Sequence, residues 1–247
     1  MKNIWTIASR EYKLYFNTPI AYVIMGFILL VLGLIFTIAV NDVALGGGQS
    51  PPSVNAIVHG PLAFMLVFAI PAITMRLISE ENREGTIELL QTAPVRDWEL
   101  AVGKWLGATL FIGTIILITL VFPIILNNLV EPGIDQLMML SGYLGILLVS
   151  MAFIALGVAI SSLFTSTVAA FFTAMGINLV LWWLIAIPAQ LSSPQFAAIW
   201  RYLDFGGHYN NSMARGVIEL IDLVYFLSVV VVGLLVASVS LETKRWR

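Results

Sequence analysis

The segment MRLISEENREGTIELLQTAPVRDWELAVGKW, residues 75–105, carries ten of the charged side chains in a 247-residue chain that has 12 basic and 14 acidic residues in total. The chain as a whole is 60% hydrophobic and only 11% charged, whereas about 25% charged residues is usual for soluble domains. This composition favours lipid as the solvent. The charged segment must then lie in water between two membrane-spanning segments, because each charge at the bilayer centre costs about 2.5–3.5 kcal/mol.

Six segments are long and apolar enough to cross a membrane. About 20 helical residues, each rising about 1.5 Å, cross a hydrocarbon core roughly 30 Å thick. Helices rather than barrel strands are expected, because the apolar residues run continuously instead of alternating. The predicted spans are residues 20–40, 61–78, 100–126, 137–163, 167–187 and 221–241. We therefore predict an all-α integral membrane protein in which residues 1–247 form one transmembrane domain.

Lysine and arginine fall mainly on one side of these spans. With the N-terminus placed in the cytoplasm, only Arg201 and Arg215 are outside. The cytoplasmic basic residues are then Lys2, Arg10, Lys13, Arg76, Arg83, Arg96, Lys104, Lys244, Arg245 and Arg247. This positive-inside bias predicts that both termini and residues 75–105 are cytoplasmic.

Residues 1–18 have the pattern of an amphipathic helix. The polar positions recur at spacings of three and four, at Lys2, Thr6, Ser9, Arg10, Lys13 and Asn17. The apolar face holds Trp5, Ala8, Tyr12 and Phe16. We expect this helix to lie in the membrane interface, with lipid as a direct partner, and to be separated from the first span by Pro19.

The charged segment favours a stiff helical elbow, although a plain solvated loop is the alternative. Residues 77–90 contain no proline and many good helix formers, so the second span is expected to continue into the cytoplasm as a helix. Pro94 ends it, and Asp97 is expected to cap the third span, with Glu99 in its first turn. Gly85 marks a bend or a close backbone approach. An acidic edge, suited to a basic groove on another protein, is formed by Glu80, Glu81, Glu84 and Glu88.

Residues 71–107, PAITMRLISEENREGTIELLQTAPVRDWELAVGKWLG, resemble the signature region of ATP-binding-cassette type-2 permeases, the membrane subunits of ATP-driven exporters. The match is densest at Met75-Arg76, Glu80-Glu81, Gly85-Thr86, Glu88-Leu89-Leu90, Pro94 and Gly103-Lys104. A second block, residues 208–228, is similar to the gliding-motility branch of that family and, more loosely, to permeases linked to nitrous-oxide-reductase maturation. The resemblance implies a multi-pass protein of a bacterial or archaeal plasma (inner) membrane.

The resemblance also implies partners and a coupling site. In that family the elbow between the second and third spans is the coupling helix, which docks on a separate ATPase subunit. Carried over, the expected ATPase contacts are Glu80, Glu81, Arg83, Glu84, Gly85, Thr86 and Glu88. A second permease half, identical or related, and an outer-domain companion are further expected partners. None of the four lysines stands in a G-x-x-x-x-G-K-[ST] motif, so ATP and magnesium are expected in the partner chain, with no cofactor and no catalytic residue in this one.

Five positions within the spans, in three groups, allow two interpretations each. Gly103 and Gly107 form a lone GxxxG, either a dimer contact or an ordinary close helix packing. Pro71 and Pro123 are expected to kink their helices, either for a moving channel or as tolerated bends. Asn178, deep in the fifth span, either lines a translocation path or forms a hydrogen bond with a neighbouring helix.

Other classes of function are disfavoured. The chain has no cysteine, its two histidines lie far apart, and its net charge is −2, so a metal site and a nucleic-acid interface are not expected. An intramembrane enzyme remains a rival through His208, Asp204 and Glu219 on the outer side, although these lack a close metal-ligand spacing. A second rival is a non-transporting scaffold that passes an ATPase's stroke to an outer partner. The roughly thirty residues after the fifth span are expected to form short helices at the outer membrane surface.

Overall fold

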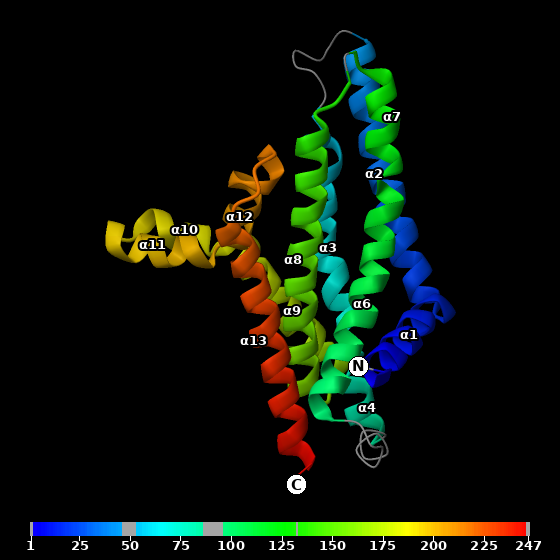
Figure 1. Ribbon diagram of the computed structural model, residues 1–247, viewed down its shortest axis with the longest axis vertical. Helices are drawn as coiled ribbons and strands as arrows, with labels where there is room; N and C mark the ends of the chain where they lie inside the picture. Colours follow the sequence, from blue (N-terminus) through cyan, green and yellow to red (C-terminus); the bar gives the residue numbers. More distant parts are fainter. Residues whose placement is uncertain (1, 46–52, 86–95, 132, 246–247) are drawn as a thin grey trace.

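The computed structural model describes residues 2–45, 53–85, 96–131 and 133–245, and within these ranges it is helical with no β-strand (Figure 1). The first half comprises α1 (Lys2–Asn17), α2 (Pro19–Ala44), the π-helix η1 (Asn55–His59), α3 (Gly60–Thr74), α4 (Ser79–Glu84), α6 (Asp97–Thr119) and α7 (Val121–Leu129). The second half comprises α8 (Gln136–Leu163), α9 (Thr167–Leu179), the π-helix η2 (Val180–Leu184), α10 (Ala186–Leu191), α11 (Pro194–Leu203), α12 (Phe205–Asn211), the 3-10 helix η3 (Met213–Arg215) and α13 (Leu220–Arg245). The predicted all-helical class is confirmed.

Six helical segments in the described residues are long and apolar enough to cross a membrane, as predicted. They are Pro19–Val43, Asn55–Glu84, Asp97–Leu129, Gln136–Leu163, Thr167–Leu191 and Leu220–Lys244. Each contains its predicted segment and extends it by up to six residues at either end. Both chain ends and α4 lie at the same end of the bundle, as an even number of crossings requires (Figure 1).

The fourth span, α8, forms the centre of the bundle and contacts α3, α6, α9 and α13. Small residues allow these close approaches, since a Cβ built on Gly157 would lie 2.2 Å from Thr74 Oγ1 of α3. On another face, a Cβ on Gly233 of α13 would lie 2.9 Å from the carbonyl carbon of Ala155. Helices that approach this closely gain dispersion contacts, which drive association where lipid removes the hydrophobic driving force between helices.

Each of the two prolines predicted to bend a helix leaves a carbonyl that a neighbouring helix satisfies. Pro71 has no N–H to donate to the carbonyl four residues earlier, and the side-chain amide of Asn178 donates to that Val67 carbonyl over 3.4 Å. Pro123 likewise leaves the Thr119 carbonyl, which accepts a 3.0 Å hydrogen bond from the Tyr143 hydroxyl. Side chains from other helices thus satisfy the backbone groups that prolines free in a membrane.

The face of α6 that carries the GxxxG is filled by α1 of the same chain. A Cβ on Gly103 would lie 2.7 Å from the Ile7 side chain, and one on Gly107 would lie 2.6 Å from Glu11 Cβ. The two glycines therefore serve intrachain packing of the N-terminal helix, and this face is not open to a second copy of the chain. Ala8 on the predicted apolar face is fully buried, whereas Trp5 is 62% exposed, so only part of that face meets α6.

The segment between the fifth and sixth spans forms short helices, as predicted. In Figure 1, α10 and α11 project sideways from the bundle, next to α12 and the start of α13. Aromatic side chains fasten this region to the core: Phe205 stacks on Phe153 of α8 with ring centroids 5.0 Å apart, and Tyr209 packs on Trp182. Their placement at the outer membrane surface stays a prediction.

Candidate functional site

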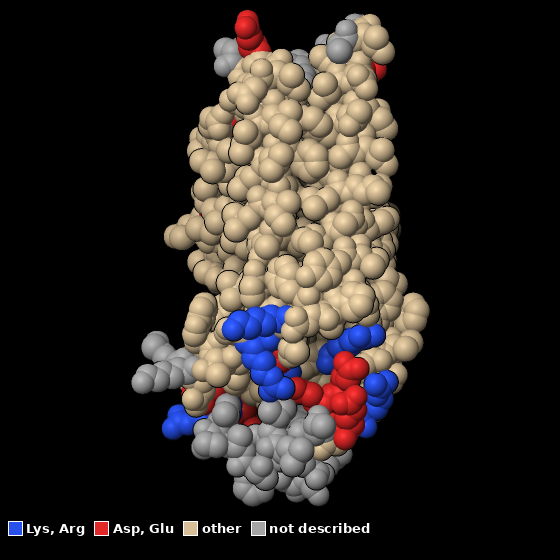
Figure 2. All heavy atoms as spheres, turned by 90° about the vertical axis from the view of Figure 1, so that its right-hand side faces the viewer, with Lys and Arg blue, Asp and Glu red and all other residues tan. Residues whose placement is uncertain are grey.

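The charged end of the bundle holds the residues that the sequence singles out. Figure 2 shows Lys, Arg, Asp and Glu side chains gathered below a broad band of uncharged residues, on the face where α1 lies. The short helix α4 lies at this end, together with the start of α1 and the end of α13 (Figure 1). This arrangement matches a protein whose apolar band lies in lipid and whose charged end lies in water.

The expectation that the second span continues into the cytoplasm as one unbroken helix is wrong, and residues 86–90 of that expected helix lie outside the described residues. The helix α3 ends at Thr74, and α4 begins at Ser79 after a turn at 75–78. Ser161, near the C-terminus of α8, stabilises this break, because its hydroxyl oxygen accepts 3.0 Å hydrogen bonds from the N–H groups of Ile78 and Ser79. The Ser161 hydroxyl in turn donates to the Met75 carbonyl over 3.2 Å, and the Ser79 hydroxyl donates to the same carbonyl. Because a free helix N-terminus exposes unpaired N–H groups, this contact fixes where α4 starts.

The far end of α4 is set by Gly85, which adopts the left-handed conformation with φ of 69°. A Cβ on Gly85 would meet nothing within 4 Å, so the glycine serves the bend and not a close approach. The helix therefore covers six residues, Ser79–Glu84. The predicted contacts Thr86 and Glu88, together with Pro94, lie outside the described residues.

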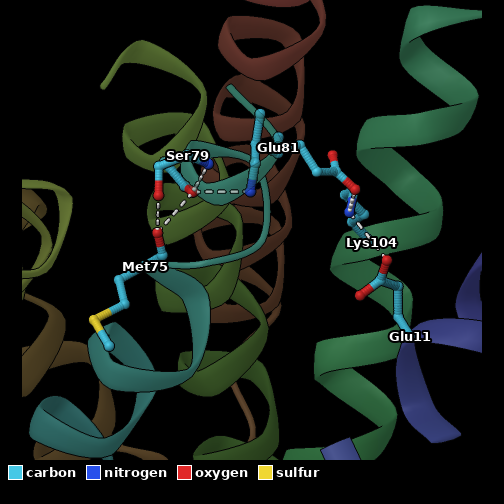
Figure 3. Close-up of polar contacts among 7 residues, drawn as sticks. Glu11, Met75, Ser79, Glu81 and Lys104 are labelled. Carbon is cyan, nitrogen blue, oxygen red and sulfur yellow. Dashed lines mark hydrogen bonds and ion pairs between the residues drawn. The ribbon is translucent and has the colours of Figure 1, made fainter. Parts of the chain in front are cut away.

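Lys104 of α6 joins α4 to α1 through a buried ion triad (Figure 3). Its Nζ lies 2.7 Å from Glu81 Oε1 and 3.0 Å from Glu11 Oε1, and only 3% of the side chain is exposed. Lys104 donates to both carboxylates, and each carboxylate is itself largely buried, with Glu11 at 13% and Glu81 at 22% exposed. Loss of one partner from a buried pair costs several kcal/mol, so this contact holds three helices in one arrangement.

The predicted acidic edge is divided between two roles. Glu81 turns inward to Lys104, whereas Glu80, Arg83 and Glu84 remain accessible. Arg83 lies 3.5 Å from Glu80 and 4.0 Å from Glu84, with side chains between 36% and 56% exposed. Such exposed pairs contribute less than about 1 kcal/mol each, so their side chains can exchange these partners for another protein's groups.

The turn between α8 and α9 ties α4 to the last span. Asn82 of α4 donates to the Phe164 carbonyl over 3.3 Å. Two residues earlier, the Ser162 carbonyl accepts from Ser240 Oγ at 3.1 Å and from Lys244 Nζ at 2.6 Å, both on α13. Hydrogen bonds and ion pairs therefore connect α4 directly to α8 and α6, and to α13 through this turn.

Sequence reasoning identified α4 but missed three of the residues that hold it: Glu11, Lys104 as a buried group, and Ser161. Glu11 lies 93 residues from Lys104, and Ser161 lies 82 residues from Ser79, so no local pattern links them. One signal was available for Lys104. It lies in the second turn of a helix that starts at Asp97, among apolar neighbours, and a cation in that position needs an anionic partner.

Two smaller expectations at other sites are also corrected. The N-cap of α6 is Arg96 rather than Asp97, and Glu99 Oε2 accepts the Arg96 N–H over 3.1 Å. On the opposite side of the protein, His208 pairs with Asp222 and not with Asp204 or Glu219. Its Nδ1 lies 2.6 Å from Asp222 Oδ1, its Nε2 lies 3.0 Å from the Tyr202 carbonyl, and its ring stacks on Tyr225. Because both ring nitrogens of His208 already have hydrogen-bond partners, this residue links α12 to α13 and is not available to a substrate.

Comparison with known proteins agrees with this architecture. The family model described as "ABC-2 family transporter protein" matches residues 7–244. A search of curated proteins gives no match. The family match covers all six candidate spans and the charged end of the bundle, from α1 to α13. The chain therefore belongs to the ABC-2 transporter family and is a membrane permease of an ABC transporter.

Proposed function

We propose that this permease couples ATP hydrolysis by a separate ABC ATPase subunit to export of a substrate, and that α4 is the contact for the ATPase. The observation that carries the proposal is the anchoring of α4. The helix has accessible charged groups at Glu80, Arg83 and Glu84. Its buried side is bonded to Ser161 of α8 and Lys104 of α6. Because these contacts keep α4 from moving independently of α6 and α8, a force that a partner applies to α4 also acts on the membrane spans.

The movement follows from the attachments. A push on α4 acts on α6 and α1 through the Lys104 triad and on α8 through Ser161. Because α8 contacts α3, α9 and α13, the helices of this permease chain move together as a packed unit, and the movement is not confined to the loop that contains α4. Two such halves, identical or related, would enclose the substrate path. The block at residues 208–228 supports a place in the gliding-motility branch, where an outer-domain companion is a further proposed partner.

A pull-down tests the ATPase contact. The full-length permease is co-expressed with the ABC ATPase from a neighbouring reading frame, and a Glu80→Lys, Glu84→Lys double variant is compared with the natural chain. We expect the variant to insert into the membrane and to lose its ATPase. The matched control, Glu131→Lys with Glu219→Lys, reverses the charge of two exposed carboxylates in the α7–α8 and η3–α13 loops. We expect this control to retain the ATPase. Equal recovery of the ATPase with both double variants would refute the proposed contact.

Orientation can be tested because the chain has no cysteine of its own. Single cysteines at Glu84 and Glu131 should react with an impermeant thiol reagent from opposite sides of the membrane, with Glu84 on the cytoplasmic side. Reconstituted vesicles then separate transport from mechanical transmission. ATP-dependent movement of a solute supports export, whereas robust ATP hydrolysis without a transported species would favour the scaffold.

A further inference from the structure

A pocket of about 590 Å³ lies at the charged end of the bundle, between α1, α2 and the α3–α4 junction. Its size is within the range of small-molecule sites, about 300–1,000 Å³. It borders the Lys104 triad but extends beyond it to the start of α2, whose apolar side chains are largely exposed. Because its lining combines apolar and charged side chains, the pocket lies at the boundary between the apolar band and the charged end, the two regions that Figure 2 shows. In a membrane protein such a boundary is the level of the lipid headgroups.

The pocket lining includes two arginines that form no ion pair within 4.0 Å among the described residues, although Arg10 is close enough to Glu81 to act on it electrostatically. Arg10 comes from α1 and Arg76 from the turn after α3, and both are exposed. The third cation of the lining, Lys104, is already matched by Glu11 and Glu81. Two guanidinium groups from separate elements suit a phosphate, whose oxygens accept paired hydrogen bonds from each.

The lining also includes carboxylates, and Arg83 already lies 3.5 Å from Glu80 and 4.0 Å from Glu84. These exposed pairs are weak, so the cation of a headgroup can replace Arg83. Glu80 and Glu84 stand four residues apart on α4, so they share one helix face. A phosphate alone would satisfy the arginines and leave these carboxylates facing an added negative charge. A headgroup that carries both a phosphate and an ammonium group can bind the arginines through the phosphate and the carboxylates through the ammonium group.

The remaining wall is apolar and includes one polar group. Its apolar lining residues include Ile20, Ala21 and Ile24 of α2 and Ala72 and Ile73 of α3. The Tyr15 hydroxyl, which belongs to the same lining, is buried and has no hydrogen-bond partner in the described structure. Burial raises the pKa of Tyr15 well above its ordinary value, so the hydroxyl stays protonated and able to donate. An ester or phosphate oxygen of a lipid is a suitable acceptor.

We propose that this pocket binds the headgroup of phosphatidylethanolamine, with the phosphate on Arg10 and Arg76, the ammonium group on Glu80 and Glu84, and the upper acyl chain along Ile20 and Ile24. Phosphatidylglycerol has the phosphate but no cation for the carboxylates. Phosphatidylcholine has a cation but no N–H to donate to them. Of these three lipids, only phosphatidylethanolamine has both. The assignment uses the same Glu80 and Glu84 side chains as the ATPase contact proposed above, but it does not rest on that contact.

Native mass spectrometry of the full-length permease, without any ATPase, tests the assignment. The protein is released from vesicles of equal parts phosphatidylethanolamine, phosphatidylglycerol and phosphatidylcholine, and the retained lipid is weighed. We expect the natural chain to retain phosphatidylethanolamine in preference to the other two lipids. The double variant Arg10→Ala, Arg76→Ala should bind phosphatidylethanolamine about tenfold more weakly, which corresponds to about 1.4 kcal/mol. The charge-matched control, Arg201→Ala with Arg215→Ala, removes two exposed arginines elsewhere and should retain the lipid. Tyr15→Phe should weaken retention less than the double arginine variant.

Two results would overturn the proposal. One is equal retention of the three lipids, or retention unaffected by the Arg10 and Arg76 changes. The other is displacement of the lipid by soluble glycerophosphoethanolamine at the same concentration, which would show a site for the headgroup as a free metabolite. An unchanged unfolding midpoint of the double arginine variant in detergent shows that any loss of lipid is not a loss of fold.

Discussion

The side-chain amide of Asn178 on α9 donates to the carbonyl of Val67 on α3, over 3.4 Å, at the one carbonyl that Pro71 leaves without its helical N–H. A proline in one span and an asparagine in another, 107 positions apart, thus act as a pair. Of the two interpretations open for Asn178, hydrogen bonding to a neighbouring helix is the one that the geometry supports. The pair holds α9 against α3 at the level of the bend.

This pairing predicts a strong coupling between two substitutions. Asn178→Leu should lower the free energy of unfolding by about 0.6–1.7 kcal/mol, the range measured for hydrogen bonds between membrane helices. In a Pro71→Ala background the new N–H can satisfy Val67, so the same change should cost less than about 0.3 kcal/mol. Unfolding of the four variants in mixed micelles with rising dodecyl sulfate measures both values. Additive effects would show that the two residues act separately.

The Lys104 triad predicts a large effect from one buried charge. Lys104→Met leaves the Glu11 and Glu81 carboxylates facing each other without a cation, and should destabilise the protein by about 3–5 kcal/mol. Replacement of all three, Glu11→Gln with Glu81→Gln and Lys104→Met, should recover most of the loss. The same micelle unfolding experiment reports both, with Lys13→Met, an exposed cation of α1, as the neutral control. A triple variant no more stable than Lys104→Met would argue against charge pairing as the cause.

The Ser161 contact predicts a local change in hydrogen exchange. Ser161→Ala removes the acceptor for the Ile78 and Ser79 N–H groups, and a lost buried partner costs about 1–3 kcal/mol. We expect these two amides to exchange roughly tenfold faster or more, while amides in the middle of α8 keep their rates. Ser150→Ala is the matched control, because this buried serine of α8 bonds only its own helix at Ile146. Equal effects of the two serines would contradict a specific cap on α4.

Replacement of glycine by alanine is predicted to have opposite effects on stability at two positions of α6, Gly107 and Gly113. At Gly107 an added methyl group would lie 2.6 Å from Glu11 Cβ and 3.0 Å from the Ala8 carbonyl oxygen, so Gly107→Ala should push α1 outward and cost about 1–3 kcal/mol. At Gly113 nothing lies within 4 Å, and Gly113→Ala should be neutral or stabilise the helix by up to about 1 kcal/mol. Protease cleavage within α1 should accelerate only for Gly107→Ala. Faster cleavage in both variants would mean that α1 does not depend on this face.

The sequence by itself determined the number of spans, their approximate limits and the separation of a charged end from an apolar band. These follow from the cost of placing charge and unpaired backbone groups in lipid, which acts on every residue independently of its distant neighbours. At Gly85 the sequence allowed either a bend or a close backbone approach, and the positive φ of this glycine, with no atom near its Cβ position, supports the bend. The resemblance in residues 71–107 placed the chain in the family that the comparison confirms.

Only the tertiary structure decided what each polar group touches. The inward turn of Glu81, the partnership of Lys104 with Glu11, the cap from Ser161 and the acceptor for Asn178 all join residues at least 23 positions apart. Periodicity predicts which face of a helix is polar, but not which neighbouring helix meets it, because that depends on how the helices pack. For the same reason α3 stops at Thr74 although its sequence favours a longer helix: a serine of another helix satisfies the N–H groups at the break.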